Sequence, residues 1–361
     1  MKVKDWRKFD WPMVLAFLAL CAIGTLEIYH STQLQGESPF LTRQLARLAF
    51  GAVLFILALI INYRVFFSNI VLVYLAGIGA LFYVLFSGIE IHGSRSWVHV
   101  AGMTFQPSEF VKIIVILALA KFMADIPDRY IKAIPLMLSG FIVFVPTLLI
   151  IWQHDLGTAL TFPPVYFTML MLSGIRRQVI VISAVILILL LGGSWFVLKD
   201  YQKDRILVIF NPEQDAHGKG YQTIQSVIAI GAGEFTGRGL GQGSQGAMGF
   251  LPERHTDFIF SIIGEEIGFL GAAGVLLLYL FIFYRGLLIA YETRDKAAMY
   301  ATVGIVALYA VHLFINVGMT LGLLPVIGIP LPPLSYGGSS LVTAFIAMAL
   351  MNNFQIHRYM V

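Results

Sequence analysis

From residue 297 to residue 357 the chain reads AAMYATVGIVALYAVHLFINVGMTLGLLPVIGIPLPPLSYGGSSLVTAFIAMALMNNFQIH. This stretch contains no Asp, Glu, Lys or Arg, and it is long enough for two membrane-spanning helices, each of which needs about 20 apolar residues. Between them, residues 330–340 (PLPPLSYGGSS) break the helical pattern with proline and glycine. Irregular backbone at membrane depth is stable only where protein buries it or where it lines a cavity. The stretch therefore predicts two helices of a membrane protein, joined by an irregular connection.

The composition of the whole chain agrees with this interpretation. Of its 361 residues, 58% are hydrophobic and only 12% are charged, whereas soluble proteins carry about 25% charged residues. A water-soluble domain, a disordered chain and a nucleic-acid-binding module are therefore excluded. The net charge of +4 is weak evidence for a polyanionic partner, because the positions of charges matter more than their sum. The single cysteine, Cys21, allows no intramolecular disulfide.

The uncharged runs predict an all-α membrane protein with about ten spans. We expect a bundle that forms one polytopic domain over residues 1–361, with both termini on the cytoplasmic side. We also expect the first helix to be retained rather than cleaved, because no small-residue cleavage site is evident. The predicted spans are 11–30, 45–63, 69–88, 107–124, 133–153, 158–175, 179–198, 258–284, 299–320 and 337–355.

The distribution of basic residues predicts the orientation, because cytoplasmic segments of membrane proteins are enriched in Lys and Arg. With the N-terminus inside, fourteen basic residues lie on the inner side and three in the short outer loops. The inner residues are Lys2, Lys4, Arg7, Lys8, Arg64, Lys121, Arg129, Lys132, Arg176, Arg177, Arg285, Arg294, Lys296 and Arg358, and the outer ones are Arg43, Arg47 and Arg95. The sequence therefore predicts a multi-pass protein of the cytoplasmic (inner) membrane.

One long connection, residues 199–257, precedes the eighth predicted span and lies on the outer side. A connection of this length inside a compact domain is usually functional. Within it, the apolar spacing of residues 221–230 favours an amphipathic helix at the membrane surface. Residues 237–246 (GRGLGQGSQG) resemble a phosphate-binding loop, with Arg238 beside it. A flexible loop with left-handed backbone is the more common explanation for such a glycine run.

Charged side chains also occur inside the predicted helices. Glu109 and Lys112 are three residues apart on one helix face, where they can pair with each other. Ionisable groups at membrane depth often mark a functional cavity, although a pair that only fixes helix packing is an alternative.

Three polar clusters on the outer side could meet in space: residues 95–109, 153–157 and 252–257. A metal site made of His154, Asp155, His255 and Asp257 is conceivable from residue type alone, but the spacing is not diagnostic. Interfacial histidines that bind no metal are the simpler interpretation.

Four segments resemble the signature motifs of the shape, elongation, division and sporulation family. They are residues 106–112 (QPSEFVK), 155–158 (DLGT), 250–268 (FLPERHTDFIFSIIGEEIG) and 334–340 (LSYGGSS). The residues before Arg254 and the short tails are more similar to the rod-shape members of this family than to its division members. His154 departs from the pattern, since it stands where the family commonly has proline.

This resemblance implies a peptidoglycan glycosyltransferase that polymerises lipid II on the outer face of the cytoplasmic membrane during cell elongation. The implied partners are a class B penicillin-binding protein (a transpeptidase), other elongation-complex proteins, the polyprenyl-linked glycan and membrane lipid. Carried over by motif, Asp257 matches the essential aspartate of the family, and Glu109 and Lys112 match its buried ion pair.

The chemistry of this reaction fits the residues available. A sugar hydroxyl becomes a good nucleophile when a positioned carboxylate such as Asp257 takes its proton. Pyrophosphate is already a good leaving group, so one carboxylate suffices, and a single displacement inverts the anomeric carbon. The departing charge needs cations, either side chains or a divalent ion such as Mg²⁺ or Mn²⁺, and no organic cofactor is expected. The candidate binding residues are Arg95, Lys112, Asp155, Lys219, Arg238 and Arg254.

Two other functions fit some of these features. A flippase for lipid-linked precursors would also need many helices and a buried ion pair, but its polar residues should lie near the midplane of the membrane. A structural scaffold for cell-wall enzymes would give Asp257 and the glycine-rich stretch no role.

Overall fold

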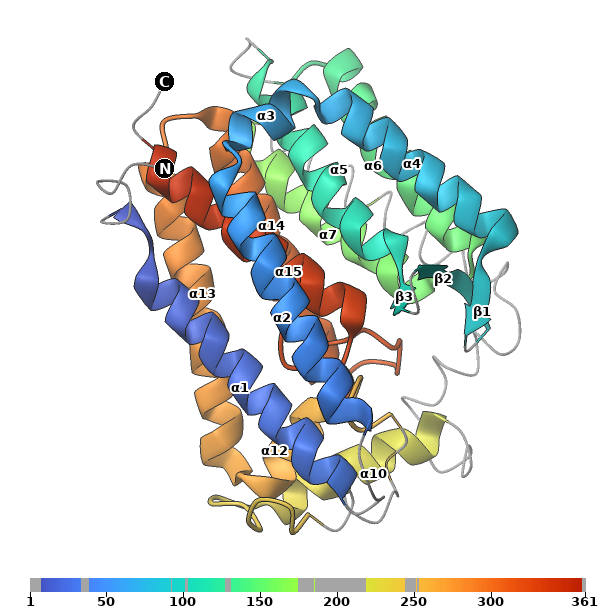
Figure 1. Ribbon diagram of the computed structural model, residues 1–361. Coiled ribbons are helices and arrows are strands. Elements are labelled where there is room, and N and C mark those ends of the chain that lie inside the picture. Colours follow the sequence, from blue (N-terminus) through green and yellow to red (C-terminus); the bar gives the residue numbers. More distant parts are fainter. Residues whose placement is uncertain are drawn as a thin grey trace.

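The computed structural model describes residues 8–33, 39–91, 93–100, 103–126, 131–174, 185, 219–243, 251 and 253–358. Within these ranges the protein is a bundle of long helices with one small sheet (Figure 1). The first helices are α1 (Trp11–Gln33), α2 (Pro39–Ile60), α3 (Tyr63–Ser68), α4 (Ile70–Ser87), α5 (Pro107–Ala124), α6 (Ala133–Trp152) and α7 (Leu156–Leu172). The later helices are α10 (Lys219–Ala232), α12 (Ile259–Glu266), α13 (Gly268–Glu292), α14 (Lys296–Thr320) and α15 (Gly338–His357).

The described helices confirm a mostly helical membrane protein. Seven of them are long and apolar enough to cross a bilayer, and α7 is a shorter apolar helix. Helix α5 coincides with the predicted span 107–124. Apart from residue 185, the predicted span 179–198 lies outside the described residues, as does the stretch from 199 to 218, so the count of ten spans stays a prediction.

Two predicted boundaries are wrong. Helix α2 begins at Pro39 rather than at residue 45, so Arg43 and Arg47 belong to the helix and not to a loop. The predicted span 258–284 is two helices, because the chain breaks at Ile267. Gly268 has a φ of 70°, and a side chain there would collide with the backbone of Gly237. The break therefore lets the glycine-rich loop pack directly against the helix junction.

Helices α14 and α15 form the centre of the bundle. Helix α15 packs closely along α2, and α14 packs against α5, α7 and α13. Most of α15 is buried. Gly51 of α2 lies directly against the ring of Phe345, and Gly304 of α14 lies against Ile116, so small residues bring these helices into close contact.

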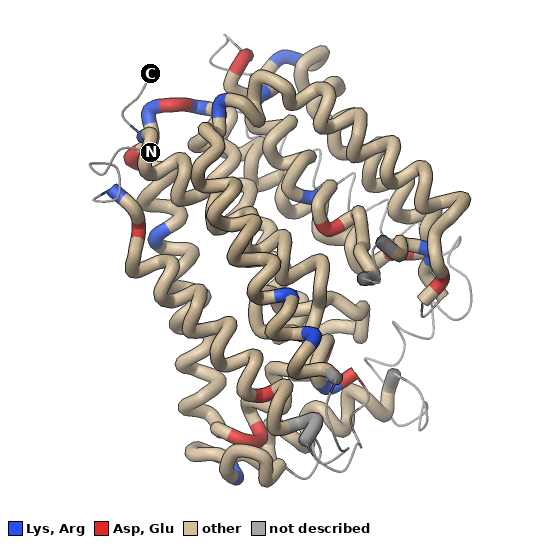
Figure 2. Tube along the Cα trace, viewed as in Figure 1, with Lys and Arg blue, Asp and Glu red and all other residues tan. Residues whose placement is uncertain are grey.

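The start of α1 and the end of α15 lie at the same end of the bundle (Figure 1). The backbone N–H of Asp10 donates to the side chain of Asn352, and Arg285 of α13 pairs with the Asp10 carboxylate at 2.7 Å. This arrangement agrees with an even number of spans. Figure 2 shows that charged residues are concentrated at the two ends of the helices and are sparse between them.

A three-stranded antiparallel sheet joins α4 to α5. Its strands are β1 (Ile89–Ile91), β2 (Ser94–Val100) and β3 (Met103–Phe105), in the order β1-β2-β3. The backbone N–H of Arg95 donates to the carbonyl of Gln153 at 3.0 Å, which fixes the sheet against the end of α6.

Candidate active site

The irregular segment between α14 and α15, residues 321–337, is the structural centre of the candidate site. We call it the α14–α15 connection. Its backbone is held by buried side chains from the surrounding helices. Asn316 of α14 donates to the carbonyl of Ile329 at 2.8 Å, and the Tyr279 hydroxyl of α13 donates to the carbonyl of Pro332 at 2.9 Å. Non-helical backbone at membrane depth is thus supplied with hydrogen-bond partners, as such a segment requires.

Asp257 lies against this connection, just before α12 begins. A Cβ added to Gly328, whose φ is 83°, would lie 3.3 Å from the Asp257 carboxylate oxygen Oδ2. Asn316 also donates to the backbone carbonyl of Asp257 at 2.9 Å. One amide side chain therefore fixes the Asp257 backbone to residue 329 of the connection.

Asp155 approaches the same connection from α7. Its carboxylate caps α7 by accepting from the N–H of Thr158 at 3.0 Å and from the Thr158 hydroxyl at 2.9 Å. It also accepts from Gln106 at 2.7 Å, which joins α7 to the start of α5. Gly157, two residues on, is in close contact with Ile327 and Ile329. The structure therefore brings Asp155 and Asp257 to the same short segment.

Glu109 and Lys112 form the predicted buried ion pair, with 2.7 Å between Lys112 Nζ and Glu109 Oε1. The structure adds a third member, because Lys112 Nζ lies 3.0 Å from Nε2 of His312 on α14. The other ring nitrogen of His312 lies 3.0 Å from the carbonyl of Pro330. Both contacts are satisfied if Nε2 of a neutral His312 accepts from Lys112 Nζ and its Nδ1–H donates to the Pro330 carbonyl. The ion pair is thus linked through His312 to the α14–α15 connection.

Arg254 and His255 lie in the turn that leads to Asp257. Arg254 is buried, and burial lowers the pKa of its guanidinium. Burial also lowers the pKa of His255, an effect that Glu253 opposes and Arg254 reinforces. The carbonyl of His255 accepts from the N–H of Tyr336 at 2.7 Å, which provides a second attachment of this turn to the connection.

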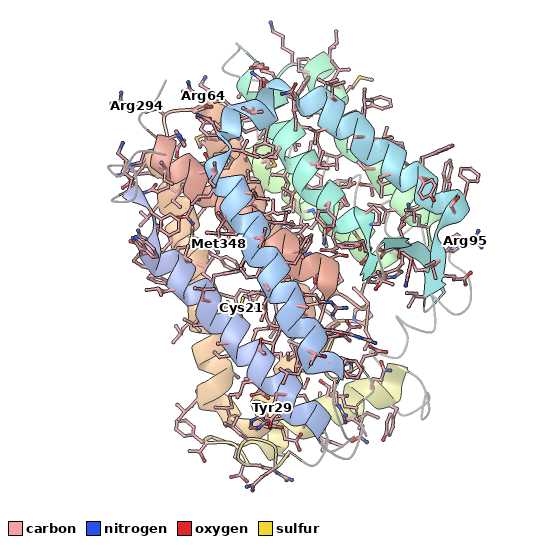
Figure 3. All side chains as sticks on the ribbon, viewed as in Figure 1. Cys21, Tyr29, Arg64, Arg95, Arg294 and Met348 are labelled. Atoms are coloured by element: carbon pink, nitrogen blue, oxygen red, sulfur yellow. The ribbon has the colours of Figure 1, made fainter. Side chains whose placement is uncertain are left out.

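The other predicted cations lie elsewhere. Arg95 is exposed on β2 and points outward at the edge of the molecule in Figure 3. Arg238 is exposed, and its side chain donates to the carbonyl of Ala232. Lys219 opens α10, the helix that the sequence predicts over residues 221–230.

Several backbone N–H groups of the glycine-rich loop already have partners where the structure describes it. The N–H groups of Arg238, Gly239 and Gly241 donate to Glu265 and Glu266, at 3.0, 3.0 and 2.7 Å respectively. These bonds fasten residues 237–241 to the end of α12. Its left-handed glycines thus serve packing, which is the simpler of the two sequence interpretations.

The metal site considered from residue type has no geometric support. Across the described ranges, no group of three or more His, Cys, Asp and Glu side chains lies close enough to hold a metal ion. His154 is exposed and has a φ of 62°, so it forms the turn before Asp155.

Sequence reasoning missed two residues of the site, His312 and Asn316. The two on α14 lie four residues apart in an uncharged run, and polar side chains on one face of a membrane helix are the signal that could have identified them.

Comparisons with known proteins agree with the motifs. The family model FTSW_RODA_SPOVE, described as "Cell cycle protein", matches residues 9–360. The peptidoglycan glycosyltransferase MrdB of Escherichia coli K12 is 35% identical over 98% of this chain and 96% of its own length.

Two solved structures share the fold. One is a chain of a peptidoglycan synthase complex that coordinates polymerization and crosslinking, with a TM-score of 0.84, 30% identity and coverage of 98% of this chain and 99% of that chain. The other is the rod shape determining protein RodA of Thermus thermophilus, with a TM-score of 0.73, 25% identity and 98% of each chain covered.

Proposed function

Because this chain belongs to the FtsW, RodA and SpoVE family of cell cycle proteins, we propose that Asp257 is the general base with which it polymerises lipid II. The chain is a peptidoglycan glycosyltransferase, as the resemblance of its motifs implies. In the proposed step, Asp257 removes the proton from the acceptor sugar hydroxyl. That oxygen bonds to the anomeric carbon of the donor, and the bond to the polyprenyl pyrophosphate breaks with inversion.

Two other predicted carboxylates of the site make structural contacts. Glu109 is paired with Lys112, and Asp155 accepts bonds that cap α7 and hold α5. Both are therefore occupied in maintaining the site. Asp257 is half-buried beside the α14–α15 connection and matches the essential aspartate of the family motif.

The experiment that tests the function supplies purified protein with labelled lipid II, alone and with its partner, and examines the products as a ladder of glycan lengths. A polymerase gives a ladder. A flippase for lipid-linked precursors gives none, and moves lipid II across vesicles instead.

We propose that the chain acts in cell elongation together with a class B penicillin-binding protein and other elongation-complex proteins. The similar synthase complex, which coordinates polymerization and crosslinking, supports this proposal. A lipid-linked substrate would reach the helical bundle laterally from the bilayer.

Arg254 is proposed as a cation for the departing pyrophosphate. We expect Arg254→Lys to slow polymerisation at low lipid II concentration by about tenfold, because lysine cannot reproduce the two-pronged donation of a guanidinium. The measurement is initial rate against lipid II concentration. Wild-type kinetics would reject the assignment.

Arg95, also proposed from the sequence, is tested in the same assay. Its side chain is exposed, so unchanged kinetics in Arg95→Lys would assign it to anchoring at the membrane surface, where lysine serves equally well. A loss comparable to that of Arg254→Lys would assign it to the pyrophosphate.

A divalent cation, Mg²⁺ or Mn²⁺, is a further proposed source of positive charge. The residues described here form no metal-binding cluster of their own. EDTA added to the lipid II assay tests the requirement directly.

The proposed orientation places Asp257 on the outer side of the membrane. We expect a thiol introduced by Gly231→Cys, in α10, to react with a membrane-impermeant maleimide added from outside. A thiol introduced by Tyr291→Cys, at the far end of α13, should react only after the membrane is permeabilised. Both positions are exposed and the native Cys21 is buried, which keeps the background low. The reverse labelling pattern would overturn the orientation.

A further inference from the structure

Four buried polar atoms without hydrogen-bond partners belong to three residues near Asp257. They are both amide atoms of Gln44, Nη1 of Arg47 and Nδ1 of His255. Gln44 has no exposed surface at all, and His255 is half-buried. A buried polar atom that lacks a partner costs about 1–3 kcal/mol, so a group of them is expensive unless something else supplies the missing contacts.

The contacts of α2 show that these atoms face one region, which contains the side chains of His255 and Tyr336. Phe40, Gln44 and Arg47 lie on one face of α2, at a spacing of four and then three residues. The ring of Phe40 lies 4.8 Å from that of His255 and 5.3 Å from that of Tyr336. The guanidinium carbon of Arg47 lies 4.3 Å from the centre of the Tyr336 ring. Gln44, between Phe40 and Arg47, therefore faces the same His255–Tyr336 pair.

The start of α15 adds positive electrostatic potential to the region around Gln44, Arg47 and His255. A Cβ added to Gly338, the first residue of α15, would lie 3.0 Å from Arg47 Nε. A side chain at residue 338 would press on the guanidinium, so glycine leaves it room beside this helix end. The N–H groups of a first helical turn and the helix dipole favour an anion there.

We propose that Gln44, Arg47 and His255 bind the diphosphate group of the lipid-linked substrate, beside the first turn of α15. This inference rests on the proposed function, which supplies a diphosphate-bearing substrate. The guanidinium of Arg47 and Nε2 of the Gln44 amide donate to phosphate oxygens, which accept several hydrogen bonds and carry the compensating negative charge. His255 lies two residues before Asp257, so a diphosphate held here has its sugar next to the general base.

The main alternative is that these residues only fill space between α2 and the turn at residues 253–257. The two explanations predict different results for the stability and the binding of the variant Gln44→Leu. If Gln44 has no ligand, replacing its unpartnered amide with an apolar side chain of similar size should leave folding and binding unchanged, or stabilise the fold. If Gln44 binds phosphate, the variant keeps its stability and loses affinity.

The experiment measures binding of farnesyl pyrophosphate to the purified full-length chain in nanodiscs. Farnesol, which lacks the phosphates, separates head-group affinity from binding of the apolar tail. We expect Arg47→Lys and Gln44→Leu each to raise the Kd for farnesyl pyrophosphate by about tenfold or more, since hydrogen bonds to a charged group are lost. Binding of farnesol should not change.

Arg43→Lys is the matched control, because Arg43 lies one turn away on α2 and its side chain is exposed. It should bind farnesyl pyrophosphate as the wild type does. Thermal unfolding of each variant shows whether it is folded. Gln44→Leu provides the decisive comparison should Arg47→Lys prove unstable.

A comparison with Asp257→Asn separates this proposal from the proposed function. That variant should bind farnesyl pyrophosphate at least as well as the wild type, whether or not Asp257 is the base. Wild-type affinity in folded Gln44→Leu and Arg47→Lys would overturn the diphosphate site and leave the role of Asp257 unaffected. Equal losses for farnesyl pyrophosphate and farnesol would also overturn it.

Discussion

Asp257→Asn is expected to abolish glycan polymerisation while the protein remains folded. Asparagine has nearly the same size but cannot take a proton, and a positioned general base contributes about 10²–10⁴-fold to a reaction rate. The fold should tolerate the change because Asn316 holds the backbone carbonyl of residue 257 rather than its side chain. The measurement is the glycan ladder made from labelled lipid II, together with the yield and thermal unfolding of the purified variant.

Glu253→Gln is a suitable control for this prediction. Glu253 lies in the same turn, and its backbone carbonyl accepts from the N–H of Asp257, which glutamine leaves intact. The variant removes one negative charge close to Asp257 and should still make long glycans. A folded Asp257→Asn protein that produces the wild-type ladder would rule out the general base.

Lys112→Met is expected to lower the free energy of unfolding by about 3–5 kcal/mol, because it leaves the Glu109 carboxylate buried without its cation. Glu109→Gln should have an effect of the same sign. His312 makes the loss of Lys112 more severe, since the Lys112 ammonium lies within hydrogen-bonding distance of the His312 ring as well as of Glu109. Because His312 contacts the carbonyl of Pro330, we expect glycan synthesis to fall as well.

The same helix provides a control for that ion pair. Lys121 and Asp125 are also 2.7 Å apart on the helical turn that ends α5, but their side chains are 39% and 58% exposed. Lys121→Met should therefore cost less than about 1 kcal/mol. The double variant with Glu109→Gln and Lys112→Met should recover part of the stability that either single change loses. Equal thermal unfolding of Lys112→Met and Lys121→Met would show that burial gives the first pair no special role.

Local features of this fold could be predicted, and contacts between distant segments could not. Helix α5 coincides with its prediction because Pro107 starts it and the apolar run continues to Ala124. The predicted start of helix α2, residue 45, is six residues late because Arg43 and Arg47 interrupt the uncharged run, although an arginine partly covered by Tyr336 and the start of α15 can lie inside a helix. The sheet was treated as a loop, since its strands of three, seven and three residues are too short to show a pattern.

The candidate site shows the same limit. Asp257, Glu109 and Lys112 could be named from motifs, because each lies in a long stretch of matching sequence. The role of Asn316 could not be predicted, because it depends on accepting groups at residues 257 and 329, which come together only in the folded bundle. The diphosphate site of Gln44, Arg47 and His255 likewise joins segments more than two hundred residues apart in the chain.

The central position of α15 has a consequence for how the protein is made. Every other described helix leaves the ribosome before α15, yet α15 occupies the space between α2, α5, α13 and α14. Until it is inserted, the faces of those helices that contact α15 lack that neighbour, and Gln106 lacks the hydroxyl of Ser339 to which its N–H donates at 2.8 Å. Assembly of the active site is therefore a late event in biosynthesis. We expect a chain interrupted near residue 337 to make no glycan, because it lacks α15 and the contacts of α15 with α2 and α5.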